Sequence, residues 1–393
     1  MFSSRVKRNQ AVNRLSLAWG AKKSSGTMLL DLTESNPTRS GFSYDGEAIF
    51  RALAQPGSLL YQPHPQGLPG ARQAVADYYR ERGASVEADS LILTSGTSEA
   101  YGSLFKLLAN PGDEILVPVP GYPLLEVLTE LESVRQVPYR LLYEEPRGWR
   151  IDMERLRNTI SNRTAAIVSV SPNNPTGSFL KTDELAEVGE LCRQFGLALI
   201  VDEVFADYGR GADENRVQCA AAHRGCLTFV LNGLSKVAGL PQLKLAWIHV
   251  SGPDALCRQA REHLEFINDA YLTVATPIQN AAADILRRRG TIQAQILARV
   301  ETNASALEEE METVPSCRIL KREGGWYAVL RLPEDCPDED IAVQLLEEDD
   351  VYVHPGYFYD FSTGGFLVIS LLTPLEIFRE GVARIAARLR GRA

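Results

Sequence analysis

Short apolar runs alternate with helical patterns between about residue 59 and residue 252. The runs are rich in Val, Ile and Leu, which is typical of strands buried on both faces, and their alternation with helices predicts βαβ units and a parallel sheet. One helix is predicted from Ser98 to Leu108, because Tyr101, Leu104 and Phe105 fall on one face of it. The strands are expected at residues 91–94, 114–118, 165–170, 198–201, 228–231 and 243–250.

The pattern changes beyond residue 276. Two long helical stretches, 277–289 and 291–312, lead to strands at 326–332 and 366–370, with further helices near 338–348 and 374–389. Separated strands of this kind predict a smaller α+β domain. We therefore expect an α/β protein whose large domain comprises residues 46–276 and whose small domain combines residues 1–45 with residues 277–393.

Composition and charge narrow the class of protein. The chain has 393 residues, enough for two or three domains, and its 41 basic and 50 acidic residues give a formal net charge of −9, which argues against a nucleic-acid-binding protein. No apolar run approaches the length of a membrane-spanning helix. The six cysteines form no Cys-x-x-Cys pair and the five histidines show no metal-binding spacing. We expect a soluble cytoplasmic protein with no metal site and no membrane partner.

The first 30 residues leave an alternative open. They contain basic residues but no acidic one, a composition that organelle transit peptides share. We favour an N-terminal helix followed by an arm. The basic residues concerned are Arg5, Lys7, Arg8, Arg14, Lys22 and Lys23.

Unusual polar residues follow several predicted strands, at the sheet edge where α/β proteins bind ligands. Ser95-Gly96-Thr97 precedes a helix whose free N–H groups and dipole could hold a phosphate, although a plain helix cap is the ordinary alternative. Asn174 lies in a loop of turn-forming residues, and Asp202 ends a buried strand, where a carboxylate needs a partner. Lys236 follows the strand at 228–231, although most lysines are simply solvated. Together these groups could bind a phosphorylated pyridine aldehyde.

With these residues the sequence resembles the class I aminotransferases, the aspartate aminotransferase family of fold-type I pyridoxal-phosphate enzymes. The resemblance implies a mostly parallel seven-stranded sheet covered by helices, pyridoxal 5′-phosphate as cofactor and a homodimer. The matching residues run through nearly the whole chain: Asn36-Pro37, Tyr61 with Gly67, Ser95 to Ala100, Pro120 to Pro123, Asn174 to Gly177, Asp202 to Val204, Ser235-Lys236 and Gly324-Gly325.

The resemblance also implies a role for each matched residue. Lys236 would form a Schiff base with the cofactor and, once the substrate amine displaces it, would shuttle a proton. Asp202 would pair with the pyridine nitrogen, Asn174 would donate to the phenolic oxygen, and Tyr122 would stack on the ring. The phosphate would be held by Ser95, Gly96, Thr97 and Ser235, with Tyr61 reaching it from the partner subunit.

Three departures from the family pattern concern the cofactor. Phe205 stands where relatives usually have a tyrosine that donates to the phenolic oxygen, so we predict a more basic Schiff base unless Tyr208 substitutes. Gly233 replaces a frequent phosphate-binding serine. Lys244 takes the place of a phosphate-binding arginine and supplies a point charge without the planar fork, which predicts weaker cofactor retention.

A fourth departure concerns the substrate. Val368 stands where relatives have an arginine that binds the α-carboxylate, and valine cannot form that bidentate pair. Either another cation replaces it or the substrate has no α-carboxylate. Arg39, beside the Asn36-Pro37 turn, is the first candidate cation and Arg331 the second, although Arg331 is as easily an outward residue of a strand.

The reaction implied by the resemblance is transamination, in which an amino group passes from a donor to a 2-oxo acid through Lys236. Two alternatives keep the cofactor: carbon–sulfur β-elimination by a lyase, and decarboxylation. A DNA-binding regulator is disfavoured, because the N-terminal 40 residues are too short for a helix-turn-helix domain. Nucleotide-dependent enzymes are disfavoured because the sequence lacks both a Gly-x-Gly-x-x-Gly turn after a strand and a phosphate-binding P-loop.

Overall fold

The computed structural model describes residues 2–3, 5–6, 13–333 and 336–391. Lys7 and Arg8 of the basic N-terminal stretch lie outside these ranges. Within them, the stretch forms α1 (Arg14–Ser24), which begins at Asn13, whose side chain accepts a hydrogen bond from the backbone N–H of Ser16.

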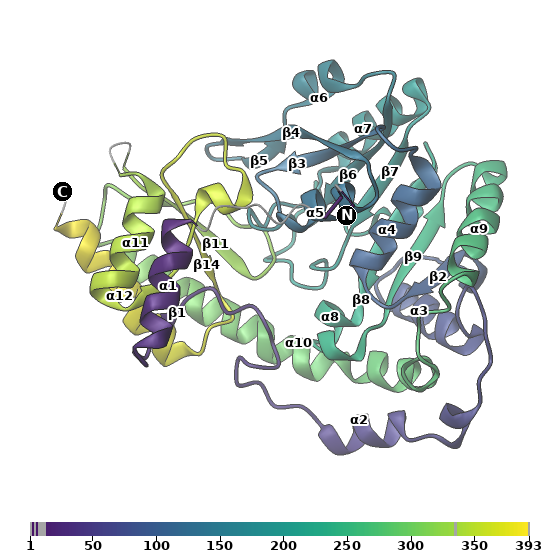
Figure 1. Ribbon diagram of the computed structural model, residues 1–393, viewed down its shortest axis with the longest axis horizontal. Coiled ribbons are helices and arrows are strands. Elements are labelled where there is room, and N and C mark those ends of the chain that lie inside the picture. The colour runs from purple at the N-terminus through teal and green to yellow at the C-terminus, as the bar shows by residue number, and fades with distance from the viewer. Residues whose placement is uncertain (1, 4, 7–12, 334–335, 392–393) are drawn as a thin grey trace.

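A large mixed sheet forms the centre of the molecule (Figure 1). Its strand order is β2-β9-β8-β7-β6-β3-β4-β5, and β2, β3, β4, β6, β7 and β8 all run in the same direction. Only β9 and β5 run against them, so the prediction of a mostly parallel sheet is confirmed. The bounds are β2 (Leu91–Thr94), β3 (Glu114–Val119), β4 (Arg135–Glu144), β5 (Gly148–Ile151), β6 (Thr164–Val170), β7 (Ala198–Asp202), β8 (Thr228–Gly233) and β9 (Ala246–Ser251).

Two of these strands were missed from the sequence. β4 and β5 form an antiparallel hairpin at one end of the sheet, so the sheet has eight strands rather than seven. Residues of β4 are mostly exposed or half-buried. Because this hairpin is not covered on both faces, it lacks the continuous apolar run by which the buried strands were recognised.

Helices cover both faces of the large sheet. On one face α4 (Thr97–Leu108), α5 (Leu124–Leu131) and α9 (Asp254–Asp269) share an apolar core with the sheet. On the other, α6 (Met153–Thr159) and α7 (Thr182–Phe195) pack near the middle, and α3 (Pro69–Glu81) packs with α10 (Thr276–Met311) over β2 and β9. This three-layer arrangement confirms the predicted α/β class.

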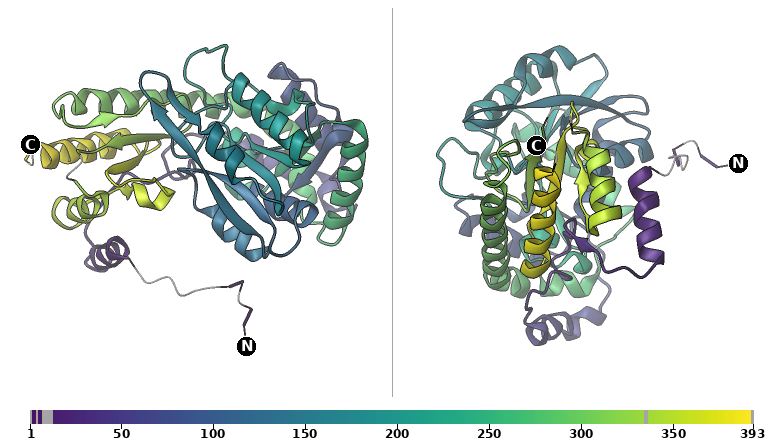
Figure 2. Two further views of the ribbon diagram at one scale, coloured as in Figure 1. Left: turned by 90° about the horizontal axis from the view of Figure 1, so that it is seen from above. Right: turned by 90° about the vertical axis from the view of Figure 1, so that its left-hand side faces the viewer.

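A second, smaller part contains the sheet β10-β11-β14-β13. A separate parallel pair joins β1 (Leu30–Asp31) to β12 (Val351–Tyr352), so the N-terminal arm is hydrogen-bonded to the C-terminal part of the chain. Figures 1 and 2 show α1 beside α11, and Figure 2 shows α11 between α1 and the C-terminal helix α12. The remaining bounds are β10 (Arg318–Ile319), β11 (Tyr327–Arg331), α11 (Asp338–Asp349), β13 (His354–Pro355), β14 (Phe366–Ser370) and α12 (Leu375–Arg390).

One helix connects the two parts. The sequence predicted two helices at 277–289 and 291–312, but the structure has a single helix, α10 (Thr276–Met311), that continues through Gly290. The prediction of a break was wrong, because a lone glycine costs a helix only about 1 kcal/mol, and apolar contacts on both sides of it keep α10 continuous. The domain division at residues 276 and 277 stays a prediction; the pairing of β1 with β12 is an observation in its favour.

Candidate active site

The predicted site residues lie at one edge of the large sheet. β6, β7 and β8 are parallel neighbours, and Val170 pairs with Asp202, which pairs with Leu231. Asn174, Asp202 and Lys236 follow or end these three strands, so the shared strand direction brings them to the same edge. Ser95 to Thr97 and Tyr122 follow β2 and β3 at that edge.

Asp202 is buried and held by two donors. The Tyr101 hydroxyl donates to its Oδ2 over 3.0 Å, and the Val204 N–H donates to its Oδ1 over 3.0 Å. Burial raises the pKa of Asp202 to about 6, although both hydrogen bonds and the charge of Lys236 lower it. A carboxylate placed in this way can still pair with a cationic ring nitrogen, which would favour its charged form.

Lys236 lies in α8 (Leu234–Val237), a single turn that follows β8 directly. Its Nζ lies 5.0 Å from the ring centroid of Trp326 and 5.5 Å from that of Phe205. Burial among these rings lowers the pKa of Lys236 to about 8, while the charge of Asp202 acts in the opposite direction. The amine is therefore neutral, and nucleophilic, over more of the physiological pH range than an exposed lysine.

The candidate phosphate site lies where β2 meets α4. A Cβ on Gly96 would come within 2.9 Å of the Lys244 Nζ, so the ammonium group lies directly over the backbone of Gly96. Lys244 itself has a left-handed backbone (φ 53°) just before β9. The N-terminal N–H groups of α4 and a positive charge thus meet at one place, which is a favourable environment for a phosphate dianion.

Neighbouring residues constrain Ser95, a predicted phosphate contact, and Gly233, the position where relatives have a phosphate-binding serine. The Ser95 hydroxyl and N–H both donate to the Glu99 carboxylate, over 2.5 and 2.6 Å, so Ser95 could reach a phosphate only if Glu99 moved. Gly233, where relatives have a serine, has no room for a side chain: its Cβ would lie 2.8 Å from the Cβ of Ala246. The glycine therefore follows from the close pairing of β8 with β9.

Asn174 lies in a tightly packed loop. Its Oδ1 is buried and has no hydrogen-bond partner among the described residues, and its side chain lies beside the phenol of Tyr327. Gly177, at the end of the loop, has φ 68°, and a Cβ there would lie 2.4 Å from the carbonyl oxygen of Gly324. Asn174 is therefore positioned by contact with the segment that leads into β11.

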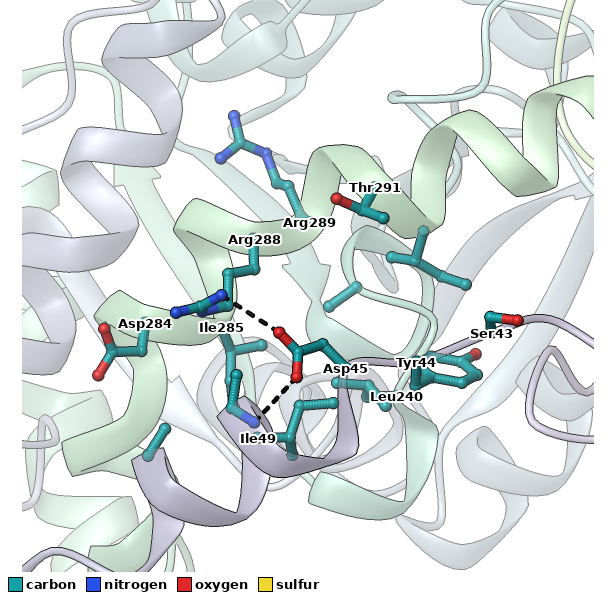
Figure 3. Close-up of a pocket in the computed structure, with 14 residues that line it drawn as sticks. Ser43, Tyr44, Asp45, Ile49, Leu240, Asp284, Ile285, Arg288, Arg289 and Thr291 are labelled. Atoms are coloured by element: carbon teal, nitrogen blue, oxygen red, sulfur yellow. Dashed lines mark hydrogen bonds and ion pairs between the residues drawn. The ribbon is translucent and has the colours of Figure 1, made fainter.

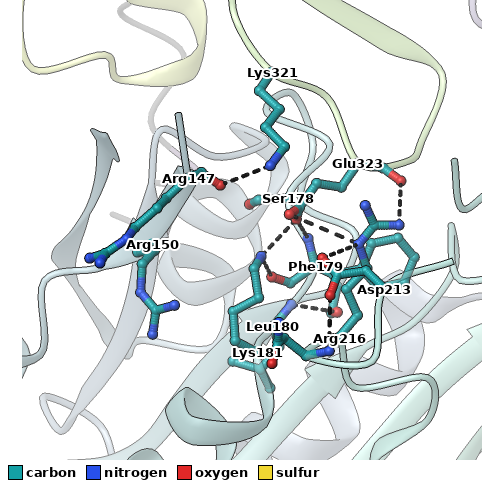
Figure 4. A network of polar contacts seen from close by, with 12 residues as sticks. Arg147, Arg150, Ser178, Phe179, Leu180, Lys181, Asp213, Arg216, Lys321 and Glu323 are labelled. Atoms are coloured by element: carbon teal, nitrogen blue, oxygen red, sulfur yellow. Dashed lines mark hydrogen bonds and ion pairs between the residues drawn. The ribbon is translucent and has the colours of Figure 1, made fainter. Parts of the chain in front are cut away.

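That contact contains a buried ion pair (Figure 4). The Lys181 Nζ lies 2.7 Å from the Glu323 carboxylate, and both side chains are less than a tenth exposed. Glu323 also accepts a hydrogen bond from the N–H of Phe179 over 2.8 Å. This pair ties the segment after β6 to the residues that lead through Trp326 into β11.

The structure shows that Tyr208 does not replace the missing tyrosine at position 205. Its hydroxyl donates to the backbone carbonyl of Lys236 over 2.6 Å, so it holds the main chain of α8. Instead, the ring of Tyr327 packs edge-on against Phe205, with centroids 6.3 Å apart. Tyr327 was not predicted as a site residue from the sequence, although it follows the matched Gly324-Gly325 pair and Trp326 directly.

The other predicted residues lie further from Lys236 or on the surface. Arg39 is exposed in the turn after Pro37, and Arg331 is exposed at the far end of β11. Tyr122 is half-exposed, and Tyr61 is 73% exposed in a loop where Leu59 is 94% exposed. Neither arginine is in contact with Lys236 or Asn174 in the described ranges.

A separate cavity of about 160 Å³ lies between α2 (Gly46–Leu53) and α10 (Figure 3). Asp45 joins its two walls, because it accepts a hydrogen bond from the N–H of Ala48 and lies 3.4 Å from Arg288. None of the predicted site residues lines this cavity.

The chain also matches a known protein family. A sequence model described as aminotransferase class I and II matches residues 28–385, which is most of the chain. The chain therefore belongs to the class I and II aminotransferases and is a pyridoxal-phosphate-dependent aminotransferase that acts on amino acids and 2-oxo acids.

Individual relatives share about a quarter of their residues with it. The glutamate-pyruvate aminotransferase AlaA of Haemophilus influenzae is 26% identical over 369 residues, which cover 92% of this chain and 90% of that one. Human tyrosine aminotransferase is 27% identical over 326 residues, covering 81% and 71%. The structure of an alanine aminotransferase from Pyrococcus furiosus superposes with a TM-score of 0.89 at 24% identity over the full length of both chains, which confirms the fold.

The described residues lack a helix able to cross a membrane and a cluster of side chains able to hold a metal ion. None of their helices combines the length and the apolar character that crossing a membrane requires. No group of three or more His, Cys, Asp or Glu side chains among them is arranged to hold a metal ion.

Proposed function

We propose that Lys236 is the catalytic lysine of this aminotransferase. The observation that carries the proposal is the position of its amine, which is partly buried against Trp326 and Phe205 at the strand edge that also presents Asp202 and Asn174. Its lowered pKa of about 8 suits both covalent attachment of an aldehyde and proton transfer near neutral pH.

The surrounding residues fit pyridoxal phosphate. The cradle formed by Gly96, the start of α4 and Lys244 suits its phosphate, and the buried Asp202 carboxylate suits its ring nitrogen. When bound, the cofactor withdraws electrons from the substrate carbon that loses a proton. Asn174 would orient the ring through its amide, and Lys236 would carry the proton. Thr97 and Ser235, each near a helix start, would add phosphate contacts.

We further propose a homodimer. Tyr61 lies in an exposed segment with Leu59 and Leu60, and large apolar side chains exposed together are typical of protein–protein interfaces. In a dimer, Tyr61 would reach the phosphate site of the partner subunit. Size-exclusion chromatography coupled to light scattering should give twice the chain mass, and a monomer would contradict the proposal.

L-Alanine and L-glutamate are the donors to test first, with pyruvate and 2-oxoglutarate as acceptors, because the relatives are named for these compounds or for alanine. A cytoplasmic location is our proposal from the six cysteines, all of which are free thiols. The lyase and decarboxylase alternatives are supported by one observation, the valine at position 368.

Borohydride reduction tests the proposal directly. Reduction of the cofactor-loaded protein should leave a stable label on the peptide that contains Lys236, and Lys236→Ala should abolish it. Lys244→Ala is the matched control: it should keep the label on Lys236 while weakening cofactor retention. A label elsewhere, or none, would contradict the assignment. Adding an amino donor alone should convert the cofactor once and stop, whereas a lyase would release ammonia continuously.

A further inference from the structure

One face of the small sheet carries both Tyr327 and the position at which an arginine is missing. Tyr327 pairs with Ser370, and Val329 pairs with Val368, across β11 and β14. Residues paired in this way point to the same face of a sheet, as do residues two apart on one strand. Ala328 and Leu330 point the other way, into the main apolar core of the small part. Tyr327 is therefore the diagonal neighbour of Val368 on the same face.

The phenol of Tyr327 lies in a polar cluster beside the candidate active site. Burial raises the pKa of this phenol to about 12, and the side chains of Ser35 and Asn174, which lie beside it, act to lower that pKa. Its ring packs against Phe205, whose ring in turn lies 5.5 Å from the Lys236 Nζ. The ring of Phe205 thus contacts both the ring of Tyr327 and the amine of Lys236.

The segment before Asn36 closes the cluster. The Ser370 hydroxyl donates to the carbonyl of Glu34 over 2.6 Å, which fixes residues 34–35 against the end of β14. The Glu34 carboxylate accepts a hydrogen bond from the N–H of Asn36 over 2.8 Å and lies close enough to raise the pKa of Tyr327. The cluster thus offers uncharged donors, with one negative charge beside it.

An aminotransferase has to bind a carboxylate near its lysine, because both amino acids and 2-oxo acids carry one. Val368 cannot supply a charge, Arg39 is exposed, and Arg331 is four residues from Tyr327 along β11, about 13 Å at the rise of a strand. His354 pairs directly with Val368, but its Nδ1 lies 3.2 Å from the Tyr359 hydroxyl and is already partnered. Tyr327, with Ser35 and Asn174 beside it, supplies uncharged donors next to Val368 on the side that adjoins Phe205.

We propose that the phenol of Tyr327, together with the Ser35 hydroxyl and the Asn174 amide, binds the α-carboxylate of the substrate in place of an arginine. The proposal rests on the proposed function, since it assumes that the substrate reacts at Lys236. Hydrogen bonds from uncharged donors are strong enough to favour a substrate that has a carboxylate. When the substrate has none, uncharged donors lose less free energy than a buried arginine, whose charge would be left unpaired.

Two substrates that differ only in the carboxylate give the test. The holoenzyme is mixed with the L-amino acid that converts its cofactor fastest, and separately with the amine formed by removing that carboxylate, such as ethylamine for alanine. Single-turnover absorbance gives a rate and an apparent affinity for each. Tyr327→Phe should weaken the affinity for the amino acid about tenfold or more and leave that for the amine within about twofold. The amino-acid preference would fall by the same factor.

Two further variants separate this role from a structural one. Tyr139→Phe is the matched control, because Tyr139 is also buried but its hydroxyl donates to the Val168 carbonyl over 2.8 Å within the large sheet; it should leave the preference unchanged. Glu34→Gln removes the nearby negative charge while keeping an oxygen for the N–H of Asn36, so it should tighten amino-acid binding. A carboxylate site requires both results: weaker amino-acid binding in Tyr327→Phe and tighter amino-acid binding in Glu34→Gln.

Several outcomes would overturn the proposal. If Tyr327→Phe weakens the affinity for the amino acid and for the amine equally, Tyr327 only supports the fold. If it instead shifts the pH titration of the cofactor absorption band without substrate, Tyr327 acts on the cofactor through Asn174. If Arg39→Ala alone removes the amino-acid preference, the arginine is the anchor. If no amine or amino acid converts the cofactor, the proposed function itself fails, and borohydride labelling of Lys236 identifies that case.

Discussion

The hydroxyl of Tyr101 donates a hydrogen bond to Asp202 over 3.0 Å, joining α4 to the end of β7 inside the candidate active site. This bond lowers the pKa of Asp202, while burial of the carboxylate raises it. The tyrosine therefore helps to keep Asp202 ionised at neutral pH, the state in which it can pair with a protonated ring nitrogen.

Tyr101→Phe should raise the pKa of Asp202 above its value of about 6. The acidic limb of the activity profile should move to higher pH, because more of the carboxylate is protonated at each pH. Loss of a hydrogen bond to a charged group should also lower the free energy of unfolding by about 2 kcal/mol. Tyr139→Phe is the control, since that buried hydroxyl donates to the Val168 carbonyl; it should leave the acidic limb in place.

The lowered pKa of Lys236 predicts how the apo-protein captures its cofactor. Only the neutral amine attacks an aldehyde, so the capture rate should rise with pH around a midpoint of about 8 rather than 10.5. Asp202→Asn removes the charge that raises this pKa, and should move the midpoint lower. Stopped-flow absorbance after adding pyridoxal phosphate measures the rate. A midpoint above 10 would contradict the burial of the amine.

Phe205→Tyr should restore the phenol that relatives carry. A hydroxyl that donates a hydrogen bond to the phenolic oxygen of the cofactor stabilises the negative charge on that oxygen. The pKa of the Schiff base at Lys236 should therefore fall by about one unit. Titration of the visible absorption band measures it. Phe205→Leu, which changes the same side chain without adding a donor, should not lower this pKa.

Alanine substitutions at Gly177 and Gly196 distinguish the cost of backbone strain from the cost of a steric clash. Both have φ 68°, but a Cβ on Gly177 would lie 2.4 Å from the Gly324 oxygen, whereas nothing lies within 4 Å of a Cβ on Gly196. Gly196→Ala should cost about 1–2 kcal/mol of unfolding free energy for backbone strain alone. Gly177→Ala should cost more, and should also weaken cofactor binding by displacing Asn174. Equal losses in denaturant titrations would refute the contact.

The ion pair of Lys181 and Glu323 should contribute strongly to stability. Glu323→Gln leaves a buried ammonium group without its counter-charge, which should cost about 3–5 kcal/mol in urea unfolding. Glu190→Gln is the matched control, because it breaks the exposed pair with Arg193 and should leave the unfolding curve nearly unchanged. A loss below 1 kcal/mol for Glu323→Gln would show that the pair is not buried in solution.

The elements that could be predicted from the sequence are those with a continuous apolar signal of their own. The buried strands were predicted because each is a continuous apolar run, and the residues that follow them, from Ser95 to Lys236, could be assigned to one edge because parallel strands end together. The half-exposed hairpin of β4 and β5 and the continuity of α10 through Gly290 gave no such local signal.

The sequence by itself determined the order of the elements, the family and the chemical groups at the strand ends, since all of these depend on residues close together in the chain. Only the tertiary structure decided that Tyr208 is bound to the Lys236 carbonyl, that Ala246 leaves no room for a side chain at position 233, and that Tyr327 lies beside Phe205 and Asn174. The contacts of Tyr208 and Ala246 lie within the large-sheet part, whereas Tyr327 meets Phe205 and Asn174 where the small sheet packs against the large one. No local pattern encodes contacts between residues that the fold brings together from separate elements.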